Sequence, residues 1–251
     1  MIYQTLFLII AGFAAAFVDS IAGGGGIISL PALLIAGVPP HLALVTNKFA
    51  STAASLTSSI QYARSAKVDF GLLKYLIPFT LIGAFWGAHT VLEIDQRMLN
   101  AMVLILILGV GIYSLFSKQI GHKEKPYPIT IRRIGGGIFL ALGLGFYDGF
   151  FGPGTGSFLM FGLIAIYGMD FIHASGNARV LNFASNIAAL ATFVLQRQVN
   201  YRIGFPFLLA MICGAALGSR MALHKGIKLV KPIFIIMSLA AAGKLLYNLL
   251  H

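Results

Sequence analysis

Eight apolar stretches, each long enough to cross a bilayer as an α-helix, constrain this chain more than any other feature of its sequence. A bilayer core needs about 20 apolar residues per helix, and a run such as 102–110 (MVLILILGV) is apolar on every face instead of alternating as a barrel strand does. Only 10% of the residues are charged, whereas soluble domains carry about 25%. The sequence therefore predicts an all-α polytopic membrane protein. The stretches lie at about 3–21, 41–60, 72–92, 98–116, 134–150, 174–196, 204–221 and 232–250.

The chain also repeats itself. Two shorter apolar pieces each follow a glycine-rich break, and an aspartate precedes each break: Asp19 and Asp148 lie 129 residues apart. Asn47 and Asn177 follow at an offset of 130, and the runs GAFWG and GAALG at an offset of 131, with small residues spaced for close helix packing. Landmarks that recur in one order at a nearly constant offset predict a duplicated fold.

The duplication divides the chain into a first membrane repeat (1–116), a basic cytoplasmic linker (117–133) and a second membrane repeat (134–251), integrated into one membrane domain. If each glycine-broken pair turns back as a re-entrant hairpin, each repeat crosses three times and the second is inverted. If the pair crosses continuously, both repeats point the same way. Cytoplasmic segments carry an excess of Lys and Arg. The hairpin alternative places 12 basic residues inside and 3 outside, against 10 and 5 for continuous crossings, so the charges favour the inverted repeat.

Four charged residues fall inside the predicted spans: Asp19, Lys48, Asp148 and Arg179. A charge inside a span costs about 2.5–3.5 kcal/mol on insertion scales, so it indicates a functional site by default. The alternative is structural, with two buried ion pairs that lock the repeats together. A cation beside an amide donor, as at Asn47–Lys48 and Asn177–Arg179, is what an oxyanion needs, because an arginine can bind it through two hydrogen bonds.

The glycine runs Gly23–Gly26 and Gly152–Gly156 precede short helical pieces that begin near Ile27 and Ser157. Glycine allows a ligand to approach the backbone closely, and a helix N-terminus attracts anions through its free N–H groups. We expect the two helix starts to meet near the midplane. The alternative is that the glycines only permit tight turns and close packing. Polar stripes on the helices that follow, with Ser51, Ser55, Asn182 and Asn186 among them, predict either a cavity lining or interhelical hydrogen bonds.

These residues together resemble the TauE/SafE sulfite exporter family of membrane permeases, part of the TSUP superfamily. The resemblance rests on GGGG at 23–26, TNK at 46–48 and GFYDGFFGPGTGSF at 145–158, and extends over nearly the whole chain. It implies transport of sulfite, thiosulfate or sulfonates such as sulfoacetate across the cytoplasmic (inner) membrane. The two basic positions are offset by one residue, because Lys48 aligns with Ala178. The resemblance implies that the substrate lies among Gly23, Gly24, Gly25, Gly26, Asn47, Lys48, Gly152, Gly154, Thr155, Gly156, Asn177 and Arg179.

The residues and the resemblance together predict a secondary transporter that is no enzyme and needs no cofactor or metal. Asp19 and Asp148 are expected either to carry a coupling proton or to orient the basic side chains. Two rival functions are an anion channel and an intramembrane aspartyl enzyme that uses both aspartates, although the Gly-x-Gly-Asp run of such enzymes does not occur. The expected partners are the lipid bilayer, a small anion and a coupling proton or cation; nucleic acid is excluded, and oligomeric state stays open. Cys213, within a span, is expected to be a small buried hydrophobe.

Overall fold

The computed structural model describes residues 2–95, 98, 102, 128–196 and 201–225, and every regular element in these ranges is an α-helix. The all-α prediction is therefore confirmed. The predicted spans 98–116 (apart from Met98 and Met102) and 232–250, and residues 117–127 of the predicted linker, lie outside the described residues.

Six of the helices are long, and four of them, α1, α4, α8 and α9, are long and apolar enough to cross a membrane. At a rise of 1.5 Å per residue, the 21 residues of α1 extend about 30 Å, which is the thickness of a bilayer core. Each long helix coincides with an apolar stretch that the sequence predicts. Their bounds are Ile2–Ala22 (α1), Pro40–Arg64 (α3), Phe70–Glu93 (α4), Ile131–Phe150 (α6), Phe171–Leu195 (α8) and Tyr201–Lys225 (α9).

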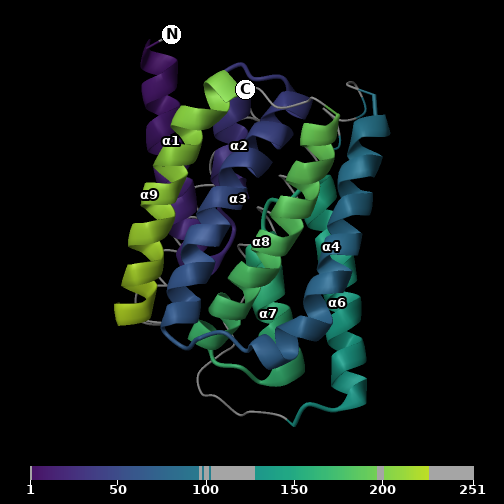
Figure 1. The fold of residues 1–251 in the computed structure, drawn as a ribbon. Coiled ribbons are helices and arrows are strands. Elements are labelled where there is room, and N and C mark those ends of the chain that lie inside the picture. Colours follow the sequence, from purple (N-terminus) through teal and green to yellow (C-terminus); the bar gives the residue numbers. More distant parts are fainter. Residues whose placement is uncertain (1, 96–97, 99–101, 103–127, 197–200, 226–251) are drawn as a thin grey trace, which may run out of the picture.

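Two short helices, α2 (Gly26–Ile35) and α7 (Thr155–Tyr167), follow the glycine-rich breaks. In Figure 1 α2 returns beside the upper part of α1 and leads to the start of α3 at that same end, whereas α7 lies near the lower end, where α8 begins. Because the chain turns back after each break, this arrangement supports the hairpin alternative. That the two repeats are related by inversion stays a prediction, since the last span of each lies outside the described residues.

The chain can turn back at the breaks because glycine accepts backbone angles that other residues rarely adopt. Gly23 and Gly24 have φ of 80° and 87°, and Gly152 and Gly154 have φ of 100° and 85°. Each break thus places two glycines in the left-handed region immediately before a helix starts. The turns end α1 and α6 inside the bundle and leave the N-termini of α2 and α7 facing its centre.

Close packing between the repeats follows from a second set of glycines. Helix α4 of the first repeat packs on α6 of the second, and α9 packs on α1. A Cβ atom added to any of four glycines on α4 and α9 would lie only 2.1–2.2 Å from a backbone carbonyl oxygen of the facing helix. The predicted role of the GAFWG and GAALG runs in helix packing is therefore confirmed. The four glycines are Gly83, Gly87, Gly214 and Gly218.

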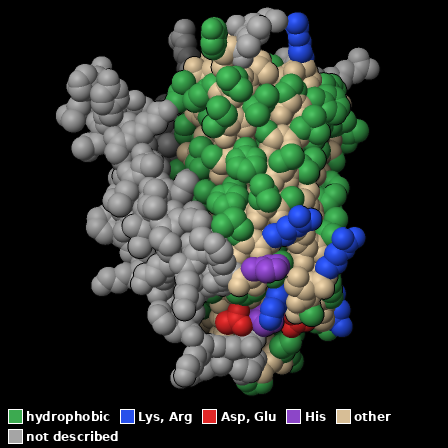
Figure 2. Space-filling model, turned by 90° about the vertical axis from the view of Figure 1, so that its left-hand side faces the viewer, with side chains coloured by type: hydrophobic (Ala, Val, Ile, Leu, Met, Phe, Trp, Pro, Cys, Tyr) green, Lys and Arg blue, Asp and Glu red, His purple; other side chains and the backbone are tan. Residues whose placement is uncertain are grey.

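The outer surface is apolar over most of its height and charged toward one end. Figure 2 shows one face that hydrophobic side chains largely cover, with charged and histidine side chains gathered near its lower end. Cys213 is exposed on this apolar surface, so the expectation that it is buried is wrong: an apolar helix in a bilayer carries no sequence signal for the side that faces lipid. Among described side chains, the basic residues of the lower end are Arg64, Lys67, Lys74, Arg132, Arg133 and Arg220, and Arg202 lies at the opposite end.

Asp170 fixes the start of α8 and therefore the position of the polar helix face that follows. Its carboxylate accepts hydrogen bonds from the backbone N–H groups of Ile172 and His173 at 2.8 and 2.9 Å, and it contacts Nδ1 of the His173 ring at 2.7 Å. Burial alone raises the pKa of a carboxyl, but these hydrogen bonds outweigh it and hold the pKa of Asp170 below its ordinary value.

We expect Asp170→Asn to lower the free energy of unfolding by about 0.3–1 kcal/mol, the usual contribution of a negative charge at a helix N-terminus, because the amide oxygen keeps the cap hydrogen bonds but carries no charge. Since the folded protein depresses the pKa of Asp170, the contribution of the wild-type carboxylate is complete above about pH 4 and is lost as the pH falls further. Thermal unfolding in detergent between about pH 3 and pH 7 measures both effects. An Asp170→Asn variant with the same acid sensitivity as wild type would contradict the assignment.

Candidate functional site

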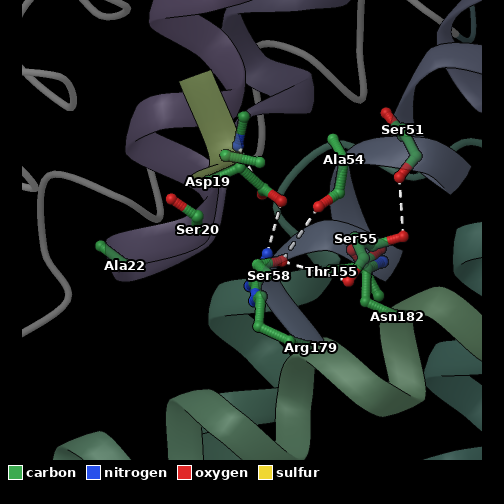
Figure 3. Close-up of polar contacts among 12 residues, drawn as sticks. Asp19, Ser20, Ala22, Ser51, Ala54, Ser55, Ser58, Thr155, Arg179 and Asn182 are labelled. Atoms are coloured by element: carbon green, nitrogen blue, oxygen red, sulfur yellow. Dashed lines mark hydrogen bonds and ion pairs between the residues drawn. The ribbon is translucent and has the colours of Figure 1, made fainter. Parts of the chain in front are cut away.

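Two buried ion pairs lie at the centre of the bundle. Lys48 Nζ on α3 lies 2.7 Å from Asp148 Oδ1 on α6, and Arg179 on α8 pairs with Asp19 on α1. Figure 3 shows Arg179 reaching toward the Asp19 carboxylate, with the serines of α3 beside them. Each pair joins a residue of the first repeat to one of the second, so the structure brings together all four charges that the sequence places inside spans.

Helix positions explain why these four side chains converge. Asp19 and Asp148 belong to the last turns of α1 and α6, immediately before the chain breaks and turns back. Lys48 and Arg179 lie at the same position in the first half of α3 and α8, which pack against each other at the centre of the bundle. A long basic side chain from each central helix therefore meets an aspartate from the end of a helix in the other repeat.

Asp148 lies in a closed network of donors. Besides Lys48, its carboxylate accepts a hydrogen bond from the Ser185 hydroxyl and one from Asn182 Nδ2 at 3.2 Å. Lys48 Nζ also donates to Asn186 Oδ1 at 3.0 Å. The side chains of Lys48 and Asp148 are only 3% and 2% exposed, so this pair is fully desolvated and depends on these hydrogen bonds.

Asp19 has fewer donors and is more open. Its Oδ1 accepts the backbone N–H of Gly25, at the start of α2, at 2.9 Å, and its Oδ2 accepts from Arg179. The Asp19 side chain is 22% exposed, whereas that of Arg179 is 2% exposed. The carboxylate therefore lies where the N-terminus of α2 and a guanidinium together favour an anion.

The two glycine-rich breaks meet each other at this centre. A Cβ atom on Gly23 would lie 2.2 Å from the backbone nitrogen of Ser157, and one on Gly26 would lie 2.8 Å from Cα of Pro153. A Cβ on Gly156 would lie 2.1 Å from a terminal nitrogen of Arg179. Side chains are thus excluded from these positions by the facing backbone and by the cation, which confirms that the breaks come together as the sequence predicts.

A small pocket opens between the ion pairs and the breaks. Its cavity volume is about 20 Å³, space for about one water molecule. Four buried side-chain atoms have no hydrogen-bond partner in the described part of the chain: the hydroxyls of Thr46 and Ser59 on α3, Arg179 Nε, and Asn186 Nδ2, which belongs to a residue of the pocket lining. The lining residues are Asp19, Gly25, Gly26, Asn47, Lys48, Ser51, Asp148, Gly152, Gly154, Gly156, Asn182, Asn186 and Met211.

Five of the predicted site residues do not line the pocket. Gly23 and Gly24 form the turn behind it, and Arg179 borders it through Gly156. The remaining two, Thr155 and Asn177, make structural contacts.

The hydroxyl of Thr155 donates to the carbonyl of Gly152 at 2.7 Å and so closes the second break. Asn177 Oδ1 accepts the backbone N–H of Asp69 at 3.0 Å, and its Nδ2 donates to the carbonyl of His173 at 2.8 Å. Asn177 therefore ties α8 to the connection between α3 and α4.

Sequence reasoning missed several residues that belong to the site. Asn182, Asn186 and Ser51 appear in the polar stripes, but helical spacing alone does not show which stripe faces the cavity. Ser185 could not be identified as a site residue, because serine occurs throughout the packed faces of this chain. Met211 cannot be distinguished in the sequence from the other apolar residues of its span. Most Ser and Thr hydroxyls of α3 instead bond to carbonyls of their own helix, as Ser55 does to Ser51.

The chain belongs to the TauE/SafE family, whose model, described as sulfite exporter TauE/SafE, matches residues 8–245. A "probable membrane transporter protein" of Haemophilus influenzae is 36% identical over 241 residues, covering 96% of this chain and 94% of that one. YfcA of Escherichia coli, with the same description, is 36% identical over 96% of this chain and 89% of its own length. ORF9 of a Sinorhizobium species has the same description and is 37% identical over 98% of this chain and 93% of its own length. No solved structure matches significantly.

The family and these relatives are described as membrane transporters, which decides against the intramembrane aspartyl enzyme. The geometry agrees, because Asp19 and Asp148 are each engaged by a different cation instead of sharing a proton with each other. The protein is a multi-pass membrane transporter of this family.

We expect Lys48→Met to lower the free energy of unfolding by about 3–5 kcal/mol, because it leaves the Asp148 carboxylate buried without its cation. The double variant Lys48→Met/Asp148→Leu should recover most of that loss, since a well-packed apolar pair replaces both charges. Denaturation of the detergent-solubilised protein measures the free energy of unfolding of the single and the double variant.

The matched control is His89→Gln, which removes the exposed pair that His89 forms with Glu93 at 3.3 Å and should change stability little. Equal stability of the single and double Lys48 variants would contradict the view that Lys48 and Asp148 compensate each other.

Proposed function

We propose that the protein is a secondary transporter of a small sulfur-containing oxyanion or organosulfonate, such as sulfite, thiosulfate or sulfoacetate. The observation that carries the proposal is a small central pocket, lined by Lys48 and bordered by Arg179, at which two donors, Asn186 Nδ2 and Arg179 Nε, have no partner in the described part of the chain. A buried unpaired donor costs about 1–3 kcal/mol, and an oxyanion supplies the missing acceptors. The description of the family as sulfite exporters supports this substrate class.

The pocket combines three kinds of donor that suit an oxyanion. Lys48 and Arg179 supply positive charge, and Arg179 can bind two oxygens at once. The helix starts at Gly26 and Thr155 supply the partial positive charge of a helix N-terminus, with no Cβ at the neighbouring glycines to keep an anion away. Asn186 then contributes a side-chain amide from the central helix α8.

The size of the pocket favours a carrier over a channel. Its cavity holds about one water molecule, so an oxyanion of several heavy atoms does not fit without a rearrangement. Both ion pairs and both glycine-rich breaks lie between the two repeats, so a rocking movement of one repeat against the other opens the pocket to one side at a time. Counterflow, in which substrate on the far side accelerates uptake, separates a carrier from the rival anion channel.

The charge distribution supports an orientation in the bacterial inner membrane. Six described basic side chains, from Arg64 to Arg220, gather at the end where α3 and α9 finish and where α4, α6 and α8 begin, and Arg202 lies at the other end. Lys and Arg are enriched in cytoplasmic segments, so this end faces the cytoplasm. The N-terminus then lies on the outer side.

We expect Asn186→Ala to weaken thiosulfate binding about 10- to 150-fold, because a hydrogen bond to a charged group contributes about 1.5–3 kcal/mol. A thermal-shift screen with sulfite, thiosulfate, sulfate, sulfoacetate and acetate identifies the ligand, since a specific ligand stabilises the folded state by mass action. Uptake into proteoliposomes then gives the transport rate.

Asn177→Ala is the matched control, because it removes a buried amide of the same helix that contacts the α3–α4 connection instead of the pocket. It should lower thermal stability and leave the affinity of the folded protein unchanged. If Asn177→Ala weakened binding as much as Asn186→Ala does, or if none of the sulfur anions bound, the proposed site or substrate class would be wrong.

A further inference from the structure

One anion position of the site is already filled by the protein itself. The Asp19 carboxylate accepts the N–H of Gly25 at the start of α2 and pairs with Arg179, which are two of the donors that the proposed function assigns to the substrate (Figure 3). Substrate and Asp19 therefore compete for the same donors. The anion can bind there only if the carboxylate leaves or loses its charge.

We propose that Asp19 is the binding site of a proton that travels with the anion; this inference rests on the proposed function. When Asp19 takes up a proton, its carboxyl releases Arg179 and the N–H of Gly25, and the anion takes the vacated place. When the anion leaves, Asp19 gives up the proton and its carboxylate returns to Arg179. The proton offsets one negative charge of the entering anion, so burying the anion costs less than it would without the proton.

Asp19, and not Asp148, has the geometry of an exchangeable group. The Asp148 side chain is 2% exposed and accepts from Lys48, Ser185 and Asn182, which fixes both of its oxygens. The Asp19 side chain is 22% exposed and lines the pocket, so a proton from water can reach it. The Lys48–Asp148 pair then stays closed and keeps Lys48 in position while the Asp19 pair opens and closes.

The titratable groups near Asp19 are held in contacts of their own, so Asp19 is the group that exchanges the proton. Arg179 faces it from α8, and α3 contributes the titratable side chains of Lys48 and Tyr62 to the same buried region. The Tyr62 hydroxyl donates to the carbonyl of Ser20 at 3.0 Å, and Lys48 is held by Asp148.

The other helices packed against α1 in the described part of the chain add no charge at this point. Neither α2 nor α7 contains a charged residue, and α9 contacts α1 through glycines while its described charged side chains Arg202 and Arg220 are exposed.

The test measures thiosulfate binding to the purified protein by calorimetry between about pH 6 and pH 8, a range in which this anion does not titrate. We expect the apparent Kd of wild type to rise about tenfold per pH unit and each bound anion to take up about one proton. Calorimetry in two buffers of different ionisation enthalpy counts the protons directly on the wild-type protein, so this readout does not depend on any variant folding.

Substitutions assign the proton. Asp19→Asn, which keeps the shape without the charge, should bind thiosulfate with a Kd independent of pH, and Asp19→Glu should restore the pH dependence. Asp148→Asn is the matched control on the other pair and should keep the tenfold rise per pH unit, whatever its absolute affinity.

Three outcomes overturn the inference. Binding by wild type without proton uptake contradicts the coupling while leaving the proposed function intact. Loss of the pH dependence in Asp148→Asn, with its retention in Asp19→Asn, assigns the proton to the other aspartate and contradicts the choice of Asp19. Absence of binding at every pH by sulfite, thiosulfate and sulfoacetate, in wild type and in Asp19→Asn, removes the proposed function and this inference together.

Discussion

The need to compensate charge inside an apolar bundle determines the rest of the structure. An isolated charge in a low-dielectric interior is strongly unfavourable, so each of the four charged side chains requires a partner and further hydrogen bonds. Lys48 and Arg179 find those partners only in the opposite repeat, at the ends of α6 and α1. The two repeats must therefore pack tightly together, which the close approach of α4 to α6 and of α9 to α1 permits. The glycine-rich breaks then bring two helix starts to the same point.

This compensation is unequal in the two halves of the site. One pair is fully buried in a network of amides and a hydroxyl, whereas the other includes a partly exposed carboxylate bound to a backbone N–H. The one-residue offset between Lys48 and Arg179 in the repeats accompanies this difference. An internal repeat can thus supply two similar ion pairs and still use them differently, one as a fixed pair and the other as a pair whose carboxylate exchanges with the anion.

Sequence predicts the helices and the convergence of the charges well, and the details of the site less well. The stretch at 72–92 becomes α4 at Phe70–Glu93, because apolar length and the aspartate cap determine a spanning helix locally. The sequence cannot show which aspartate meets which cation, since those contacts join residues that lie 100 and 160 positions apart. Asn177 and Asn186 look alike in sequence, yet packing turns only Asn186 to the pocket. The exposure of Cys213 could not be predicted, because the lipid-facing and the buried sides of a membrane helix are both apolar. In soluble proteins the outward side of a helix is polar and can be recognised from the sequence.

The central claim is that the substrate anion replaces a carboxylate of the protein between Arg179 and the start of α2. A cryo-electron microscopy structure with thiosulfate at about pH 6 tests it most directly. The account predicts anion density within about 3 Å of the Arg179 guanidinium and the N–H of Gly25, with the Asp19 carboxyl displaced and Lys48 still on Asp148. Anion density elsewhere in the bundle, with Asp19 still paired to Arg179, would contradict it.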